Sequence, residues 1–133
     1  MKALIVDDML VDRKVLVQIL SKYAECETAD SAVVAFEKIV TSLENNDPYD
    51  LICLDILMPK IDGEETIQKI RRLETIEKYK DLKKPKILIV TSSEERAETL
   101  KKMPNGPHGY IIKPINRASL LDFLNKFGLV STA

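Results

Sequence analysis

The stretch LICLDILMP, at positions 51–59, decides the fold class of this chain. Its first four residues, Leu51 to Leu54, are all apolar, which is typical of a strand covered on both faces. Asp55 ends the run, and Met58-Pro59 follows in a loop before a helical pattern begins after Gly63. A buried strand that leads through a polar loop into a helix predicts one unit of a parallel α/β sheet.

The same alternation extends along the rest of the chain. Other apolar runs lie at 3–6, 87–90 and 110–112, with a weaker, alternating run at 26–29 that predicts an edge strand. Apolar residues recur with helical period at 15–23, 32–43, 67–73, 97–103 and 120–127. Ser92 and Glu95 have the spacing of a capping box, and Asn116 is a good N-cap residue. We therefore expect a (βα)5 order in a single domain over residues 1–133, with no output domain.

The charge balance excludes several classes of partner. Lys and Arg total 20 against 21 Asp and Glu, for a net charge of −1, so no general attraction to nucleic acid or to anionic lipid is expected. No apolar run approaches the ~20 residues that a membrane span requires. Cys26 and Cys53 lie in strand-like segments, where they are expected to be reduced and structural. These features predict a cytoplasmic protein without membrane insertion or direct nucleic-acid binding.

Polar residues at the ends of the apolar runs are the candidate functional residues. Asp7 and Asp8 follow the first run, Asp55 the third, Thr91 the fourth and Lys113 the fifth. Ligands of open parallel sheets bind beyond the carboxyl ends of the strands. Three carboxylates brought close together raise one another's pKa unless a cation lies between them, and Mg²⁺ prefers oxygen ligands. The sequence therefore predicts a Mg²⁺ site beside a lysine and a hydroxyl.

As a set, these residues resemble the receiver domain of two-component response regulators. The resemblance extends from Lys2 to Phe127. Asp7 and Asp8 match the acidic pair, Asp55 the phosphoacceptor, Thr91 the switch hydroxyl, Tyr110 the switch aromatic residue and Lys113-Pro114 the lysine with its proline. The resemblance implies a flavodoxin-like, doubly wound parallel five-stranded sheet with strand order 2-1-3-4-5.

The resemblance also implies a function. A histidine kinase or phosphotransfer protein would give its phosphoryl group to Asp55 with the help of Mg²⁺. Asp8 would bind the metal directly and Asp7 through water, and Asp55 and the backbone carbonyl of Leu57 would complete the ligands from the protein. Such a protein is not a turnover enzyme, because it catalyses only its own phosphorylation and slow dephosphorylation.

The signal would leave the domain at a second surface. Phosphorylation would draw in Thr91 and open space for Tyr110 to turn inward, and the face formed by the fourth helix, fifth strand and fifth helix would bind a separate target protein. A cis peptide bond before Pro114 would aim Lys113 at the acceptor site.

Several positions depart from the family pattern or have plainer explanations. The resemblance implies that Leu57 and Ser93 flank the path of the hydrolytic water. Neither side chain is expected to activate that water, so the phosphorylated state should be long-lived. The longer stretch 73–85 is interpreted as an extended helix followed by a solvated basic loop. His108 is expected in a solvent-facing loop rather than in a catalytic role.

Alternative functions keep part of this pattern. The chain could be a phosphorylation-independent interaction module with the same fold, or a receiver fragment of a larger regulator. A haloacid-dehalogenase-type phosphatase would need a second aspartate at the position of Leu57. A flavodoxin-like flavin carrier would need a Ser/Thr/Gly-rich loop after the first strand, where this chain has Asp7-Asp8-Met9-Leu10.

Overall fold

The structure, a computed structural model, describes residues 1–59 and 62–130. Strands and helices alternate through this part of the chain, as the sequence predicts. The strands are β1 (Lys2–Val6), β2 (Glu25–Ala29), β3 (Leu51–Leu54), β4 (Lys86–Thr91) and β5 (Gly109–Ile112). The helices are α1 (Leu10–Leu20), α2 (Ala32–Glu44), α3 (Gly63–Thr75), α4 (Glu94–Lys101) and α5 (Arg117–Lys126).

The five strands form one parallel sheet with the order β2-β1-β3-β4-β5. This confirms the doubly wound α/β fold and its strand order, including the edge position of β2. In the pairing of β1 with β3, Val6 lies opposite Leu54. The two central strands therefore end side by side, and the residues that follow them begin at the same level.

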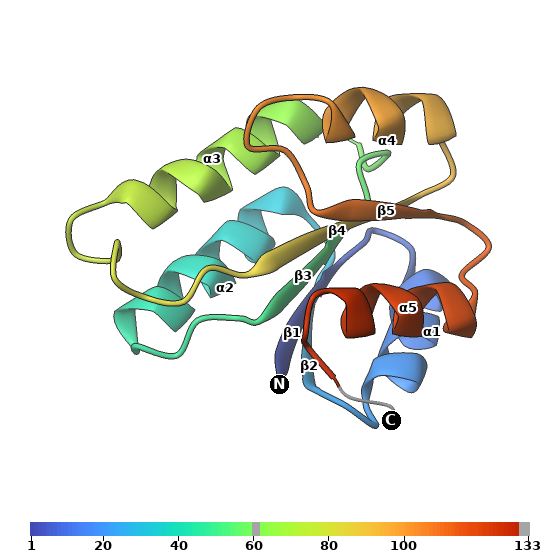
Figure 1. Ribbon diagram of the computed structural model, residues 1–133, viewed down its shortest axis with the longest axis horizontal. Coiled ribbons are helices and arrows are strands. Elements are labelled where there is room, and N and C mark those ends of the chain that lie inside the picture. Colours follow the sequence, from blue (N-terminus) through green and yellow to red (C-terminus); the bar gives the residue numbers. More distant parts are fainter. Residues whose placement is uncertain (60–61, 131–133) are drawn as a thin grey trace.

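Two layers of helices cover the sheet (Figure 1). Helices α1 and α5 pack on one face, where Leu16, Leu20, Leu120 and Leu124 share a core with the sheet. Helices α2, α3 and α4 cover the other face. The apolar run of β3 follows from this arrangement, because every residue of the strand is buried between helices on one side or the other.

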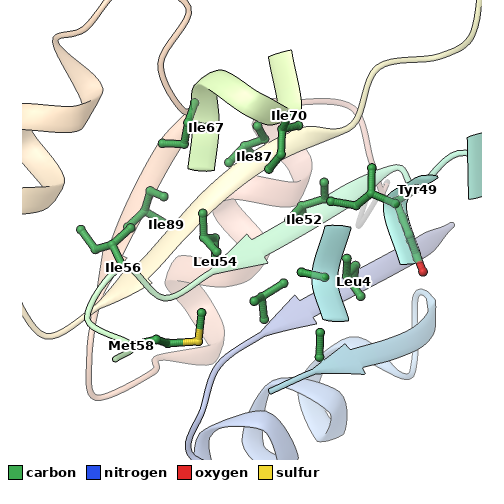
Figure 2. Packing of buried hydrophobic residues seen from close by; sticks show 14 of the residues in the cluster. Leu4, Tyr49, Ile52, Leu54, Ile56, Met58, Ile67, Ile70, Ile87 and Ile89 are labelled. Atoms are coloured by element: carbon green, nitrogen blue, oxygen red, sulfur yellow. The ribbon is translucent and has the colours of Figure 1, made fainter. Parts of the chain in front are cut away.

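Successive residues of β3 pack in opposite directions. Ile52 and Leu54 belong to the core under α2, α3 and α4, whereas Leu51 and Cys53 belong to the core under α1 and α5. Figure 2 shows Ile52 and Leu54 among the apolar side chains of the first of these cores. Full burial of one such aliphatic side chain contributes roughly 1.5–3 kcal/mol to stability. Burial also raises the pKa of the Cys53 thiol to about 12, so this cysteine is a packing residue.

Side-chain caps define the starts of α4 and α5. The hydroxyl of Ser93 accepts a hydrogen bond from the backbone N–H of Arg96 at 3.3 Å, and α4 begins at Glu94. The prediction that Ser92 caps this helix was therefore wrong by one residue. Asn116 caps α5 as expected, since its side chain accepts hydrogen bonds from two backbone amides of the first turn.

The segment after α3 differs from its prediction. Helix α3 ends at Thr75 rather than continuing into 76–85. Tyr79 is buried and donates a hydrogen bond from its hydroxyl to the carboxylate of Glu44 on α2, and Leu82 packs against the core. The connection is thus a turn that Tyr79 and Leu82 attach to α2 and the core, while its lysines are exposed, as predicted.

Among the residues that the structure describes, no helix combines the length and the apolar character needed to span a bilayer.

Candidate functional site

Main-chain hydrogen bonds fix the two aspartates that follow the central strands. The amide of Asp55 donates to the carbonyl of Val6 at 2.9 Å, and the amide of Asp7 donates to the carbonyl of Ala29 at 3.1 Å. Each bond continues the ladder of the sheet one residue beyond the end of a neighbouring strand. Both aspartates are buried, with 1% of Asp7 and 5% of Asp55 exposed. Their positions are therefore set by the sheet rather than by a free loop.

The same kind of main-chain hydrogen bond fixes Lys113 on the other side of β3. Its amide donates to the carbonyl of Thr91 at 2.9 Å. The peptide bond between Lys113 and Pro114 is cis, as predicted. The Lys113 Nζ lies 3.0 Å from Oδ2 of Asp55 and 2.8 Å from Oδ2 of Asp7. The lysine expected from the end of the fifth strand thus reaches both buried carboxylates.

Asp7, Asp8 and Asp55 form the cluster that the sequence predicts. One carboxylate oxygen from each lies within 4.8 Å of the others, which is close enough for the three to share a cation. Asp8 is the member most open to solvent. The donor set consists of oxygen atoms alone, and hard divalent cations with retained waters suit such a site. These residues can hold a metal ion.

The loops after β1 and β3 fold in the same way. Oδ1 of Asp7 accepts the backbone N–H of Met9 at 2.9 Å, and Oδ1 of Asp55 accepts the backbone N–H of Leu57 at 2.9 Å. In each case a carboxylate turns its own loop by bonding to the amide two residues further on. The second oxygen of each carboxylate is left for Lys113.

Burial and charge act in opposite directions on the pKa values of this cluster. Burial raises the pKa of Asp7 above its ordinary value, while the hydrogen bonds from Lys113 and Met9 lower it and the charge of Asp55 raises it. Burial lowers the pKa of Lys113, but hydrogen bonds to Asp12, Asp7 and Asp55 outweigh that effect and raise it. Lys113 is therefore a permanent cation at neutral pH.

The structure adds two residues that the sequence analysis did not find. Asp12, in the first turn of α1, lies with Oδ2 2.8 Å from the Nζ of Lys113. Arg13, the next residue, donates from Nη1 to the backbone carbonyl of Asp7 at 2.7 Å. The sequence indicated these residues only through their position. A helix that starts directly after a strand places its first turn beside the end of that strand, and Asp12 and Arg13 lie near the start of α1.

Thr91 and Tyr110 occupy different environments. Thr91 ends β4 and is fully buried, and its Oγ1 accepts the backbone N–H of Ser93 at 3.4 Å. Tyr110, on β5, is half-buried and donates from its hydroxyl to Oε1 of Glu98 on α4 at 3.0 Å. The structure therefore brings Thr91 to the same sheet edge as the carboxylates and holds Tyr110 on the outer side, toward α4.

Leu57 and Ser93, for which a role in phosphate lifetime is predicted, follow β3 and β4 at this edge. Leu57 is 40% exposed, and its backbone N–H donates to the carboxylate of Asp55. The Ser93 hydroxyl accepts from Arg96 as the cap of α4. One lone pair of the Ser93 hydroxyl is therefore engaged in capping the helix, which agrees with the expected position of Ser93 near the start of α4.

His108 lies in a packed environment, so the expectation of a solvent-facing position was wrong. Its Nδ1 accepts the backbone N–H of Ile87 at 3.0 Å, and its ring meets Phe127 edge-on with centroids 5.4 Å apart. Burial, together with the positive charges of Arg71 and Lys86, lowers the pKa of His108 to about 4. The neutral imidazole therefore serves as a structural hydrogen-bond acceptor and does not belong to the carboxylate cluster.

Comparison with known proteins identifies the family. The sequence model of the response regulator receiver domain family matches residues 3–125 of this chain. The chain is 29% identical to the chemotaxis protein CheY of Treponema pallidum over 121 residues, which are 91% of this chain and 78% of that protein. It is 34% identical over 128 residues to hybrid signal transduction histidine kinase L of Dictyostelium discoideum, a match to 96% of this chain but only 7% of that much longer protein.

Solved structures agree with this assignment. Response regulator protein TrrA from Thermotoga maritima, in complex with Mg²⁺ and BeF, matches with a TM-score of 0.75 and 30% identity, over 98% of this chain and 100% of that one. Chemotaxis protein CheY4 of Vibrio cholerae matches with a TM-score of 0.73 and 29% identity, over 94% of this chain and 96% of that one. An interaction module without phosphate chemistry is not favoured. The chain belongs to the response regulator receiver domain family and is a phosphoacceptor signalling switch rather than a metabolic enzyme.

Proposed function

We propose that Asp55 is the residue that accepts the phosphoryl group, from a phosphohistidine of a histidine kinase or phosphotransfer protein. The observation that carries this proposal is the 3.0 Å contact between Oδ2 of Asp55 and the ammonium group of Lys113. A phosphoryl group bound to this carboxylate would lie against a cation that the sheet holds in place. Asp55 also directly follows β3, the central strand of the sheet.

The transfer itself requires little from the protein beyond position and charge. A P–O bond forms to the Asp55 carboxylate while the P–N bond of the phosphohistidine breaks, and the imidazole leaves with the electron pair of that bond. Negative charge on the phosphoryl oxygens is stabilised by preorganised cations and donors. Lys113 supplies one such charge, and the Thr91 hydroxyl at the end of β4 supplies a donor.

The metal expected at this site is Mg²⁺. Three carboxylates within 4.8 Å of one another carry more negative charge than Lys113 neutralises alone, so the residues present fit a hard divalent cation. When bound, Mg²⁺ would neutralise charge on the phosphoryl oxygens during transfer. Asp8 and Asp55 would hold it directly and Asp7 through water, as the resemblance to the family implies. The backbone carbonyl of Leu57 would complete this set.

The proposed output depends on two side chains, Thr91 at the end of β4 and Tyr110 on β5. A phosphoryl group would draw the Thr91 hydroxyl away from the amide of Ser93, and Tyr110 would leave Glu98 and turn inward. Receiver domains act between histidine kinases and downstream targets. We propose that the target of this domain binds the face formed by α4, β5 and α5, which contains Tyr110. The cytoplasmic location and the single-domain organisation stay predictions.

Labelling with a small phosphodonor tests the acceptor assignment. Wild type with acetyl phosphate and Mg²⁺ should gain one phosphoryl group, detected by intact mass, and Asp55→Asn should gain none. Asp30→Asn is the matched control, because it removes the same charge at the end of β2. Retained labelling of Asp55→Asn, with a circular dichroism spectrum like that of wild type, would refute the assignment.

Backbone amide NMR with beryllofluoride, a mimic of the acyl phosphate, tests the output face. Shifts should spread from the acceptor site to α4, β5 and α5 and leave α2 unchanged. Shifts confined to the acceptor site would contradict the proposed switch.

A further inference from the structure

Lys113 makes one more ion pair than its proposed role requires. Its Nζ lies 2.8 Å from Asp7, 2.8 Å from Asp12 and 3.0 Å from Asp55. A lysine ammonium has three N–H donors and no acceptor. Each donor is therefore taken by a different carboxylate, and none remains for a phosphoryl oxygen.

The three carboxylates are not held equally well. Asp7 and Asp55 each accept a second hydrogen bond from a loop amide, and their side chains are 1% and 7% exposed. The Asp12 side chain is 30% exposed, and Lys113 is its polar partner within the described part of the chain. Solvent can replace Lys113 at Asp12 far more readily than it can at the other two. Asp12 is therefore the partner that Lys113 can give up at the lowest free-energy cost.

We infer that Asp12 is a positioning residue that holds Lys113 in the unphosphorylated state and releases it when a phosphoryl group arrives on Asp55. This inference rests on the proposed function of Asp55. A phosphoryl oxygen must displace one of the three carboxylates to reach Lys113. It also brings negative charge to a site where the Asp12 carboxylate already contributes one negative charge. Asp12 thus lowers the affinity of the site for the phosphoryl group and raises its affinity for a cation.

The position of Asp12 allows this role without distortion of the acceptor. It lies in the first turn of α1, where the helix dipole favours a carboxylate whether or not the lysine is bound. Its release changes the rotamer of one half-exposed side chain and leaves the hydrogen bonds of Asp7 and Asp55 to the sheet intact. The sheet edge can therefore remain fixed while the charge around Lys113 changes.

The opposite signs of the two effects provide the test. Asp12→Asn keeps the size of the side chain and removes its charge. At saturating Mg²⁺, this variant should bind beryllofluoride about three- to tenfold more tightly than wild type, as expected for loss of one partly exposed like charge. Without beryllofluoride, it should bind Mg²⁺ about twofold more weakly. A variant that merely loosened the fold would weaken both.

Three further proteins complete the experiment, with affinities measured by NMR titration. Asp12→Glu should restore both wild-type affinities, because it returns the carboxylate. Asp30→Asn should change neither by more than about twofold, because Asp30 is at the same edge of the sheet but makes no ion pair with Lys113. Asp12→Ser replaces Asp12→Asn if circular dichroism shows that the latter is unfolded.

Each outcome has one meaning. Tighter beryllofluoride binding with weaker Mg²⁺ binding supports the role of Asp12. Beryllofluoride binding by wild type that Asp12→Asn leaves equal or weaker overturns this role and leaves the proposed function of Asp55 standing. No beryllofluoride binding by wild type overturns the proposed function and this inference with it.

Discussion

Tyr110 on β5 donates a hydrogen bond to Glu98 on α4, with 3.0 Å between the two oxygens. The bond joins the proposed switch residue to the helix beside it and favours the outward position of the ring. It also raises the pKa of the Tyr110 hydroxyl, because Glu98 stabilises the protonated phenol. The equilibrium between the two positions of Tyr110 therefore depends on a residue outside the acceptor site.

Removal of this bond should favour the activated state. Glu98→Ala is expected to bind beryllofluoride about twofold more tightly than wild type, since the outward position loses one exposed hydrogen bond. The measurement is an NMR titration at saturating Mg²⁺. Glu95→Ala, which removes the same charge from the exposed face of α4, should leave the affinity unchanged. An equal effect of both substitutions would show that the charge of α4 matters and the bond does not.

Mg²⁺ binding should depend more on Asp8 than on Asp7. Asp7 is buried and engaged by Lys113 and the Met9 amide, whereas Asp8 is the accessible carboxylate of the cluster. We expect about tenfold weaker binding for Asp8→Asn and about threefold weaker binding for Asp7→Asn, from the loss of one charge at a direct and an indirect ligand. Isothermal titration calorimetry or NMR gives both values. Equal or reversed losses would contradict the ligand roles.

The acyl phosphate should hydrolyse slowly, and two side chains should set its rate. The Leu57 side chain has no polar group, and the short Ser93 side chain accepts the backbone N–H of Arg96 as the cap of α4. Leu57→Asn combined with Ser93→Glu should lose phosphate at least about tenfold faster, because an amide and a carboxylate can orient and polarise water. The rate is followed by intact mass in Mg²⁺ without a phosphatase.

The cap of α4 needs its own control in that experiment. Ser93→Ala removes the same hydrogen bond without adding a carboxylate, and it should not accelerate hydrolysis. A double variant no faster than wild type would contradict the link between these side chains and the lifetime.

His108 should make the domain less stable in mild acid. Its pKa is lowered to about 4 in the folded protein from an ordinary value of 6.5, so between these values the unfolded chain binds a proton that the folded chain does not. The stability present above pH 6.5 is therefore lost as the pH falls toward 4, by at most about 1.4 kcal/mol per pH unit.

Urea unfolding of wild type and His108→Asn at pH 7, 6 and 5 measures this effect. Asparagine can accept the Ile87 amide as the imidazole does, but it cannot titrate. The stability advantage of wild type should shrink with falling pH, and a difference that is constant over this range would exclude His108 as the cause.

The sequence was sufficient for the fold and for most of the site. Apolar runs such as 51–54 predict buried strands because both faces of a parallel sheet are covered, and the polar residue after each run then lies at a shared edge. Asp7, Asp55 and Lys113 meet for this reason. The roles proposed for them as acceptor, ligand and cation came from the resemblance of these residues to the receiver-domain motifs.

Other features could not be predicted because they depend on the packing of single side chains. An acidic residue in the first turn of a helix is common, so the position of Asp12 alone did not single it out as a partner of Lys113. Tyr79 and Leu82 are too few to form a periodic pattern, yet both are anchored on the core. His108 is a polar residue between Pro107 and Gly109, and this composition is typical of a loop. Its hydrogen bond from the Ile87 amide forms only when β4 and β5 lie side by side.

The amides of Asp7, Asp55 and Lys113 all bond to the last carbonyl of an adjacent strand, which gives the site a property of practical use. The Cα atoms of these residues are set by main-chain atoms that every amino acid except proline possesses. Side chains can therefore be exchanged at these positions while the backbone keeps its hydrogen bonds to the sheet. Histidine or cysteine introduced at two of the three would present new ligands from a rigid frame, so the domain is a suitable scaffold for a designed transition-metal centre.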